Sequence, residues 1–430
     1  MKASRYNIIF EYNGKKMAFN SRSCALAEVD EDFFKILNNP PVDGNSGNTN
    51  LIESMKSGSY IVEDDFDELE NLKMISFSGK FGNKGLGLVI APTLSCNFAC
   101  PYCYENPSKG VMSPEVQQAL LDLAENTAKS KLGVSVTWYG GEPLIAKDVV
   151  FSMSEKFIDI CRKYGVNYTA SIITNGYLID DEIVESMVKA RILDAQVTLD
   201  GPEDVHNSRR KLKVDNGEGT FNRIVHNIKK LVNKNINVDI RVNIDKTNSE
   251  TVEGLLDVLK GNQLDKCDVN FGHVRPYTSV CNSILSNCLN VEEYANTDVK
   301  LQNILRQKGF GSSGYPHYPG TKSNYCCADS LSSFVVDPKG NMYKCWNDVG
   351  NVSRKVGNVL DKESYFNSLH TKYMLWSPFK FKACEECNIL PICMGGCPYE
   401  GLKKGSPDCE KWRYSLIDIL KAKCRQEANL

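Results

Sequence analysis

Three cysteines lie close together in residues 96–104, which read CNFACPYCY. Cys96, Cys100 and Cys103 are separated by three residues and then by two. Thiolates bind zinc and iron–sulfur clusters, but a structural zinc ion or a fully ligated cluster takes four protein ligands. No suitable fourth cysteine or histidine lies nearby in the sequence. The spacing therefore predicts an iron–sulfur cluster with one open iron position for chemistry. The alternative is a zinc knuckle, which would need a fourth ligand.

A second set of cysteines occupies the last quarter of the chain, where residues 384–397 read CEECNILPICMGGC. The chain holds 17 cysteines and no recognisable secretory signal, a combination that favours metal ligation over disulfides. Because it holds only five histidines, its metal sites are expected to be rich in sulfur. Two zinc ribbons are the alternative to iron–sulfur clusters here. The cysteines of this set are Cys326, Cys327, Cys345, Cys384, Cys387, Cys393, Cys397 and Cys409.

The composition fits an ordinary globular protein of two to four domains, with 430 residues of which 42% are hydrophobic and 24% charged. A formal net charge of −2 gives no basic field for nucleic acid. No run of about 18 apolar residues is present, so no membrane span is expected. Because nothing resembles a signal peptide, we expect a cytoplasmic location.

The elements that position the first three cysteines form a repeating pattern. Six short apolar runs recur between residues 85 and 276, with amphipathic, helix-like stretches between them. This alternation predicts βαβ units and a parallel sheet. Six units are too few for a complete eight-stranded barrel, so we expect an α/β fold with a partial (β/α)6 TIM-like barrel. The cysteines follow its first strand, at the edge where such barrels place their active sites.

The CX3CX2C motif in this position resembles the signature of the radical S-adenosylmethionine (SAM) enzymes. In that family the three thiolates bind three irons of a [4Fe–4S] cluster, and the fourth iron binds the amine and carboxylate of SAM. One electron then cleaves SAM to methionine and a 5′-deoxyadenosyl radical that abstracts a hydrogen atom. The resemblance implies that Cys96, Cys100 and Cys103 are the catalytic cluster ligands.

Further motifs in the barrel segment are similar to the family's SAM-binding segments. GGEP follows the second apolar run, TNG follows the third, and TLDGPEDVHNSRR ends the fourth. An arginine suits a planar carboxylate through paired hydrogen bonds, although the adjacent Arg209 leaves the choice uncertain by one residue, and a surface ion pair is the alternative for Arg210. The resemblance places the SAM contacts at Tyr102 (adenine), Gly140, Gly141 and Glu142 (amine), Asn175, Thr198 (ribose) and Arg210 (carboxylate).

The C-terminal cysteines resemble the SPASM extension of this superfamily, which holds two auxiliary [4Fe–4S] clusters. The resemblance assigns the second auxiliary cluster to Cys384, Cys387, Cys393 and Cys409. It assigns the first to Cys326, Cys345 and Cys397.

The first auxiliary cluster departs from the family pattern. Members with two fully ligated clusters carry a further cysteine about six residues after the one that matches Cys326, where this chain has Ser332. Cys327 is one candidate for the fourth ligand, although neighbouring side chains on an extended segment point to opposite sides. The other candidate is a substrate thiolate on an open iron.

A second departure follows Cys345. Anaerobic sulfatase-maturing enzymes, which share this architecture, place a catalytic aspartate directly after this cysteine. This chain has Trp346 there, and Asp348 is out of register. The departure argues against sulfatase maturation.

The N-terminal segment, 1–84, predicts a separate module. Alternating apolar and polar residues flank Asn13-Gly14, a hairpin signal, and three helix-like stretches follow, with a break at Pro40, Pro41 and a Gly/Asn-rich tract. This winged-helix-like pattern resembles the element that holds the leader of a ribosomally made precursor peptide by strand addition. The alternative is an extension of the core domain. The acidic residues 61–70 could steer a basic leader, or form a solvated helix face.

Taken together, the chain resembles a radical SAM/SPASM peptide maturase of the thioether-forming kind found in sactipeptide and ranthipeptide biosynthesis. The resemblance implies three [4Fe–4S] clusters, SAM, a cysteine-containing precursor peptide and a low-potential electron donor such as flavodoxin or ferredoxin. The alternatives are carbon–carbon crosslinking, formylglycine formation and a non-catalytic iron–sulfur redox protein. The expected domains are the recognition module (1–84), the barrel (85–276), a connecting helix and linker (277–324) and the SPASM domain (325–430), which closes with a helix over 410–425.

Overall fold

The chain forms two compact units that are each discontinuous in sequence. We call residues 83–314 and 332–373 the barrel unit, and residues 1–82, 315–331 and 374–430 the terminal unit. The four-part division predicted above stays a prediction. Most of the Gly/Asn-rich tract after Pro41 (residues 42–47) and residues 311–317 of the expected connecting helix and linker lie outside the described residues. The computed structural model describes residues 1–41, 48–82, 84–105, 107–214, 218–310, 318–361 and 367–427.

A parallel sheet organises the barrel unit, and this confirms the α/β architecture expected from the alternating apolar runs. Its six parallel strands follow one another in the sheet in sequence order. All six carboxyl ends therefore meet at one edge. The strands are β6 (Leu86–Ile90), β7 (Val134–Trp138), β8 (Tyr168–Thr174), β9 (Ile192–Thr198), β10 (Asn237–Ile244) and β11 (Asp268–His273).

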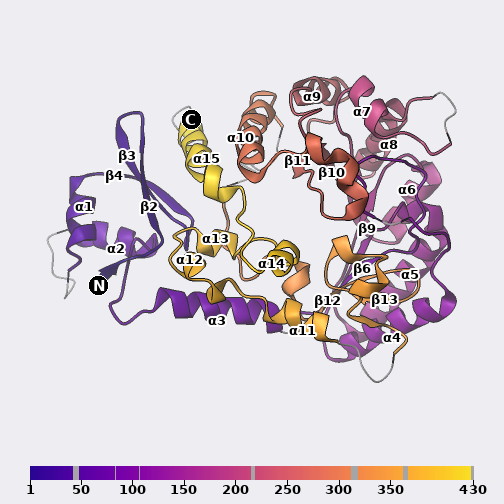
Figure 1. Cartoon of the computed structure of the whole chain (residues 1–430), viewed down its shortest axis with the longest axis horizontal. Helices are drawn as coiled ribbons and strands as arrows, with labels where there is room; N and C mark the ends of the chain where they lie inside the picture. Colours follow the sequence, from indigo (N-terminus) through magenta and orange to yellow (C-terminus); the bar gives the residue numbers. More distant parts are fainter. Residues whose placement is uncertain are drawn as a thin grey trace. The chain divides into compact units, whose positions relative to one another are not determined.

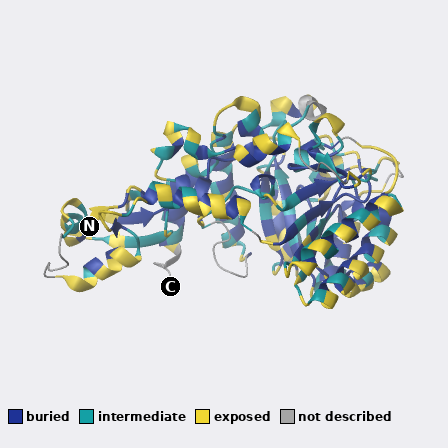
Figure 2. Cartoon of the chain, turned by 90° about the horizontal axis from the view of Figure 1, so that it is seen from below, coloured by how far each residue is buried: buried dark blue, intermediate teal, exposed yellow. Residues whose placement is uncertain are grey.

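Amphipathic helices cover the outer side of this sheet (Figure 1). In α8, the residues Ile224, Ile228 and Leu231 recur at helical spacing and are buried, while the opposite side faces solvent. Figure 2 shows the same contrast between buried strands and exposed outer helix faces. These helices are α4 (Pro114–Lys129), α5 (Lys147–Tyr164), α6 (Asp181–Lys189), α8 (Phe221–Asn233), α9 (Val252–Gly261) and α10 (Val291–Gln307), while the short α7 (Glu203–Arg209) follows β9 at the carboxyl edge of the sheet. Within the described ranges, none of the helices has the length and apolar character that crossing a membrane requires.

The inner face of the sheet is polar along β10. Along β10, Ile240 and Val242 are fully buried in the hydrophobic core, whereas Asp239, Arg241 and Asn243 alternate with them and remain partly accessible. A complete barrel would bury both faces and favour continuous apolar strands. Because this barrel is partial, its interior keeps polar side chains that are open to water or to a substrate.

Three strands from later in the chain extend the sheet beyond β6. β12 (Ser333–Val336) pairs parallel to β6, and β13 (Asn341–Tyr343) and β14 (Gly357–Asn358) continue antiparallel. The Asp337 carboxylate closes the turn between β12 and β13, because its Oδ1 accepts hydrogen bonds from the backbone N–H groups of Lys339 and Asn341. The full sheet has nine strands in the described residues. Sequence patterns alone did not indicate that these strands join the barrel sheet.

The terminal unit begins with the predicted hairpin. Tyr12 pairs with Lys15, and the two residues between them, Asn13 and Gly14, have φ of 50° and 75°, as a two-residue type I′ turn requires. The three-stranded antiparallel sheet has the order β2 (Asn7–Tyr12), β3 (Lys15–Asn20), β4 (Ala25–Val29). The expected helices follow as α1 (Glu31–Asn38), α2 (Thr49–Ser57) and α3 (Glu68–Phe81), and β5 (Ile61–Val62) pairs with β1 (Lys2–Ala3).

The two faces of this small sheet are buried against different partners. Ala18 packs with α1 and α2, whereas its neighbours Met17 and Phe19 point the other way. They pack against Leu416 and Leu420 of the C-terminal helix α15 (Trp412–Glu427), which confirms the helix predicted over 410–425. The N-terminal strands and the cysteine-rich end of the chain therefore share one hydrophobic core.

A second contact between these parts involves the proposed ligands directly. Tyr6 and Leu72, from the N-terminal part of the terminal unit, form one buried cluster with Cys384, Leu390 and Met394. Burying side chains of this size contributes roughly 1.5–3 kcal/mol each. Removing the N-terminal part would therefore expose the core beside Cys384, so the two parts cannot be separated without loss of stability.

Candidate functional site

The three cysteines of the CX3CX2C motif line a single cavity of about 180 Å³ in the barrel unit. Cys96 lies six residues after the end of β6, at the carboxyl edge of the parallel sheet. The cavity is also lined by Gly141 of the GGEP motif and by Glu105 and Lys213. The structure thus brings the three thiols together with a second motif, which follows the next strand of the sheet. Their role as cluster ligands stays a prediction.

Gly140 and Gly141 allow close contact between the β7 loop and the cysteine loop. A Cβ atom on Gly140 would lie 2.4 Å from the carbonyl oxygen of Thr93, and one on Gly141 would lie 2.4 Å from that of Ser95. Gly140 also has a φ of 110°, which L side chains rarely adopt. The backbone N–H of Glu142 donates to the Ser95 carbonyl at 2.9 Å. Only glycine fits here, and its small size leaves backbone atoms facing the cavity.

Glu142 braces two of the motifs against each other. Its fully buried carboxylate accepts hydrogen bonds from Thr174 Oγ1 at 2.7 Å and from the Asn175 backbone N–H at 2.7 Å. Burial raises the pKa of Glu142, and these hydrogen bonds act in the opposite direction. The carboxylate thus holds GGEP to TNG, the two loops after β7 and β8.

Asn97 is a site residue that motif reasoning missed, although it lies inside CNFAC. The Nδ2 of Asn175 donates to its Oδ1 at 2.7 Å and lies 4.0 Å from Cys96 Sγ. The Nδ2 of Asn97 is buried without a hydrogen-bond partner among the described residues. Leaving such a donor unpaired costs about 1–3 kcal/mol, so this amide is suited to an acceptor that enters the site.

Arg209 and Arg210, which the sequence could not separate, have different surroundings. Arg209 forms ion pairs within the fold. Its Nη1 lies 2.8 Å from Asp245 Oδ2, and its Nε lies 3.4 Å from Asp200 Oδ2. Both carboxylates are buried. These pairs leave Arg209 without spare capacity for a carboxylate ligand.

Arg210 keeps an unused donor. Its Nη1 donates to the Tyr102 hydroxyl at 2.7 Å, and its guanidinium lies 5.4 Å from the Phe98 ring centroid, but its buried Nε has no partner in the described part of the chain. Burial alone would lower the pKa of Arg210. The electrostatic interactions with Tyr102 and then with Cys100 act in the opposite direction, and the net result is a raised pKa. Because Cys100 lines the cavity, Arg210 is a buried cation beside it with hydrogen-bonding capacity left.

Tyr102 connects this arginine to the barrel strands. Its hydroxyl donates to Asp200, accepts from Arg210, and lies 3.5 Å from Asn243 Nδ2. The Arg209 guanidinium lies 5.1 Å from its ring centroid. Thr198, at the end of β9, is buried on the same part of the sheet and pairs in register with Arg241. These contacts fix the Tyr102 ring, but none of them tests the predicted adenine contact.

The donor set fits an iron–sulfur cluster with SAM. Burial raises the pKa of Cys96 to about 11 and that of Cys103 to about 12, so these thiols hold their protons unless a metal replaces them. Within the described ranges, no three His, Cys, Asp or Glu side chains are grouped around a point where they could all bind one metal ion. An iron–sulfur cluster differs from such a site, because each thiolate binds a different iron. The unpaired Arg210 Nε and Asn97 Nδ2 suit a carboxylate-bearing ligand.

A hydrogen-bonded ladder crosses the polar inner face of the sheet. Gln196 Nε2 and Asn270 Nδ2 donate to Asp239 Oδ2 at 2.8 and 3.0 Å, and Arg241 Nη1 donates to Asn270 Oδ1 at 2.6 Å. A Cβ on Gly272 would lie 1.9 Å from Arg241 Nη2, so the missing side chain makes room for this guanidinium. The ladder gives the barrel interior a charged, hydrogen-bonding lining.

The residue after Cys345 is aromatic and packed. The Trp346 ring lies 4.7 Å from that of Tyr139, and the Tyr139 hydroxyl lies 2.5 Å from the Tyr104 hydroxyl. Asp348 is buried, lies 2.8 Å from Arg354 Nε and accepts a hydrogen bond from Tyr373 at 2.9 Å. The carboxylate of Asp348 is therefore engaged by Arg354 and Tyr373. It does not take the place of the aspartate that the resemblance to sulfatase-maturing enzymes would put at position 346.

The cysteines assigned to the second auxiliary cluster gather in the terminal unit. Burial, and then the neighbouring thiols of Cys387 and Cys409, raise the pKa of Cys384 to about 11. Burial, and then Glu410, raise the pKa of Cys393 to about 12. These interactions place Cys393 beside Glu410, which directly follows Cys409 in the sequence. The four thiols thus lie in one region, and their ligation of a cluster stays a prediction.

The two glycines of CMGGC bring Cys409 into this region. Gly396 has a φ of 75° and bridges to Asp408, and a Cβ on Gly396 would lie 1.7 Å from the Asp408 carbonyl oxygen. We expect Gly396→Ala to push the 408–409 segment away. It should lower the melting temperature at least twice as much as Gly405→Ala, where φ is 69° and nothing lies within 4 Å of the added Cβ.

Thermal unfolding and iron content of reconstituted protein measure this effect. Gly405→Ala should keep its iron, because only backbone strain of about 1–2 kcal/mol separates it from the wild type. Equal melting temperatures and equal iron content in the two variants would show that the close approach at Gly396 does not position Cys409.

Cys326 and Cys327 correct one expectation. They were expected to point to opposite sides of an extended segment, but a 3-10 turn begins at Cys327, and the two thiols contact each other. This contact, followed by burial, raises the pKa of Cys326 well above its usual range. Asp329 shapes the turn by accepting from the Cys326 backbone N–H at 3.0 Å and lies 3.7 Å from the buried Lys80 ammonium.

The other residues assigned to the first auxiliary site, or discussed with it, belong to both units. Cys397 caps α14 (Pro398–Lys404) in the terminal unit. Cys345 is buried after β13 in the barrel unit, and Ser332, directly before β12, accepts from the Gly87 N–H through its backbone carbonyl. Whether Cys326, Cys345 and Cys397 share one cluster stays a prediction.

Comparison with known proteins gives a family match for the barrel unit. Residues 90–259 match the family model described as the radical SAM superfamily. The chain is 31% identical, over 75% of its length, to an uncharacterised protein of Archaeoglobus fulgidus, of which it covers 78%. It is 27% identical, over 73% of its length, to a cysteine-type anaerobic sulfatase-maturating enzyme of Clostridium novyi, of which it covers 88%.

A solved structure extends the similarity over more of the chain. The fold is similar to that of Streptococcus suis SuiB bound to the precursor peptide SuiA, with a TM-score of 0.55 and 17% identity. The match covers 95% of this chain and 98% of SuiB. Because so little of the chain lies outside the match, most of the N-terminal hairpin and helices lie within it.

Proposed function

Because this chain belongs to the radical SAM superfamily, we propose that it modifies a ribosomally made, cysteine-containing peptide by forming thioether crosslinks. One observation carries the radical SAM chemistry: three thiols line a single cavity, beside a buried arginine whose Nε has no partner in the described residues. Cys96, Cys100 and Cys103 would hold a [4Fe–4S] cluster, which supplies one-electron cleavage of SAM and hence a carbon radical able to take a hydrogen atom.

The protein's own residues would orient SAM. Arg210 offers its unpaired Nε to the SAM carboxylate, and the backbone at Gly140 and Gly141 offers carbonyl groups to the amine. Tyr102 holds Arg210 in place, and Glu142 holds the GGEP backbone against the TNG loop. Asn97 adds an unpaired amide donor to the same site.

A peptide substrate is supported by the similarity to two peptide- or protein-modifying systems. The name of the sulfatase-maturating relative indicates that it acts on a sulfatase, and the structure of SuiB was determined with its precursor peptide bound. In this chain the sheet β2-β3-β4 has two outer strands, β2 and β4, whose backbone groups could pair with an extended leader. An electron donor such as flavodoxin or ferredoxin is proposed to supply the reductant.

Thioether formation agrees better with the site than formylglycine formation does. Trp346 stands where sulfatase maturases carry an aspartate, and Asp348 is held by Arg354 and Tyr373. A thioether forms one C–S bond while one C–H and one S–H bond break. One electron leaves with the hydrogen atom and the other needs an acceptor. Auxiliary clusters on the remaining cysteines would provide it, with either Cys327 or a substrate thiolate completing the first.

The test uses anaerobically reconstituted protein with SAM, dithionite and the cysteine-containing peptide encoded nearest to the gene. We expect each crosslink to remove two hydrogen atoms from the peptide and to accompany one 5′-deoxyadenosine, as measured by mass spectrometry. A peptide with Ser in place of Cys should stay unmodified. Loss of sulfur with formation of an aldehyde would instead establish formylglycine chemistry, and absence of 5′-deoxyadenosine would exclude radical SAM activity.

A further inference from the structure

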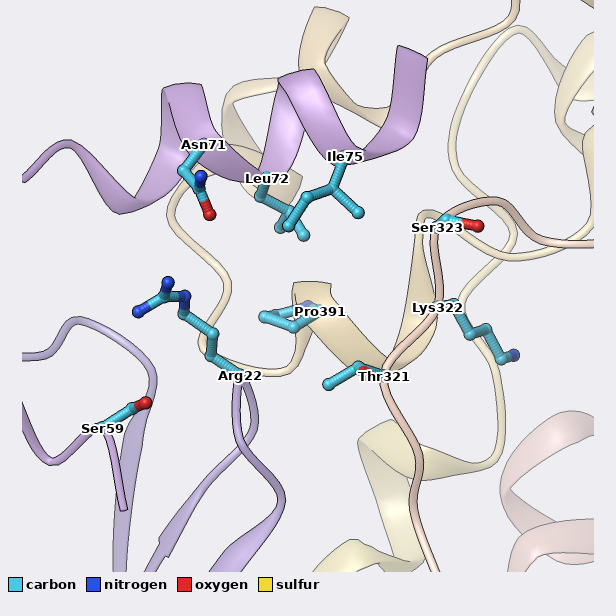
Figure 3. A pocket seen from close by; sticks show the side chains of 9 residues that line it. All are labelled: Arg22, Ser59, Asn71, Leu72, Ile75, Thr321, Lys322, Ser323 and Pro391. Carbon is cyan, nitrogen blue, oxygen red and sulfur yellow. The ribbon is translucent and has the colours of Figure 1, made fainter. Parts of the chain in front are cut away.

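A second cavity, of about 430 Å³, is lined only by residues of the terminal unit, and it shares no lining residue with the cysteine cavity. Figure 3 shows it beneath α3, where Leu72 and Ile75 point toward Pro391. Arg22 enters it from the turn between β3 and β4, and Thr321 lies on its lower side. Its volume falls in the range of about 300–1,000 Å³ that is typical of ligand sites.

Arg22 gives this cavity an unbalanced positive charge. Its guanidinium lies 4.5 Å from the Phe66 ring centroid, a contact that holds the planar group without neutralising it. No carboxylate in the described residues lies within ion-pair distance of Arg22. The second cation at the cavity, Lys322, is already balanced, because its Nζ lies 3.3 Å from Glu410 Oε2. Arg22 is therefore the group through which the cavity would favour a negatively charged ligand.

The remaining lining suits a peptide segment. Leu72, Ile75 and Pro391 form an apolar wall, and Ile75 is 38% exposed although it is aliphatic. Hydroxyl and amide groups stand around this wall, and they can pair with peptide N–H and C=O groups. They belong to Ser59, Asn71, Thr321 and Ser323.

From this juxtaposition we infer that the cavity binds an acidic side chain of the peptide substrate, flanked by aliphatic residues. Arg22 would take the carboxylate through paired hydrogen bonds, and the wall of Leu72, Ile75 and Pro391 would take the aliphatic neighbours. The inference rests on the proposed peptide-modifying function. It adds a specificity site made jointly by the N-terminal strands and the C-terminal segment, and distinct from pairing along a sheet edge.

The experiment measures binding of a fluorescein-labelled peptide with a central Leu-Glu-Leu segment by anisotropy, with the full chain and without SAM. We expect a Gln-for-Glu peptide to bind about tenfold more weakly, because a charge-assisted pair is lost. Arg22→Gln should bind both peptides equally weakly. Arg22→Glu should reverse the preference in favour of a Lys-for-Glu peptide.

Lys35→Gln is the matched control, since it removes one positive charge from the same unit at a residue that is paired with Asp32 on α1. It should keep the preference for Glu, and thermal unfolding of all variants checks that they fold. Wild-type protein that fails to bind the peptide, or that does not distinguish Glu from Gln, overturns the inference. Displacement of the peptide by free glutamate at equal concentration would assign the site to a small carboxylate, and also overturns it.

The two hypotheses fail separately. Binding to this cavity requires neither SAM nor an iron–sulfur cluster, whereas the proposed function is measured by 5′-deoxyadenosine and crosslinked peptide. Wild-type protein that cleaves SAM but shows no preference for the Glu peptide would refute the acidic site alone. Intact preference without SAM cleavage would refute the proposed chemistry alone.

Discussion

Replacing Cys96, Cys100 and Cys103 together by Ala should abolish 5′-deoxyadenosine formation from SAM. The three thiols line one cavity, and without them nothing among its other lining residues can ligate three irons. We expect the iron content of reconstituted protein to fall by about a third, corresponding to one cubane of the three proposed. Chromatography of SAM cleavage products and iron analysis measure the two effects.

Cys161→Ala is the control for this variant. Cys161 is buried on α5 in the barrel core and does not line the cavity, so its removal should cost stability without changing SAM cleavage or iron content. The assignment of the site would be wrong if the triple variant still cleaved SAM at the wild-type rate.

The two adjacent arginines should differ sharply when each is replaced by Met. Arg210→Met removes the unpaired Nε beside the cavity, and we expect about a hundredfold lower kcat/KM for SAM, mainly through KM. Arg209→Met instead leaves Asp200 and Asp245 buried without their cation. Breaking such buried pairs costs about 3–5 kcal/mol, so we expect a large drop in the free energy of unfolding.

SAM cleavage kinetics and urea denaturation distinguish the two roles. Arg210→Lys keeps the charge but not the planar donor set, and should recover only part of the SAM affinity. A result in which Arg209→Met weakened SAM binding at unchanged stability, while Arg210→Met destabilised the fold, would reverse the assignment.

Much of the barrel could be predicted because its signals are local. Short apolar runs set the strands, and sequential parallel pairing brings their carboxyl ends to one edge. It follows that loops as distant as CNFAC and GGEP meet at one cavity, as the shared lining by Cys96 and Gly141 shows. The hairpin at Asn13-Gly14 could be predicted equally well, because the type of turn depends on these two residues alone.

Other features depend on partners that the sequence does not place. Arg209 and Arg210 have the same chemistry, and only the positions of Asp245 and Tyr102 separate them. The thiols of Cys326 and Cys327 contact each other because they lie on a turn rather than on an extended strand. Asp329 holds this turn from within, and the carboxylate of Asp329 lies 3.7 Å from the ammonium of Lys80, which is distant in sequence. The addition of β12 to β6 joins segments from opposite ends of the barrel unit, beyond the reach of a local pattern.

The shared core of the terminal unit also constrains how the protein is made. Phe19 leaves the ribosome long before Leu416 and Leu420, which cover it in the folded unit. At about 5–20 residues per second, the β2-β3-β4 sheet waits roughly 20 to 80 seconds with one apolar face uncovered, while the barrel strands can already pair. Chains that stop short of α15 would keep that face exposed, which marks them for chaperones and proteases. Only a chain translated through α15 could therefore complete the unit that carries Arg22.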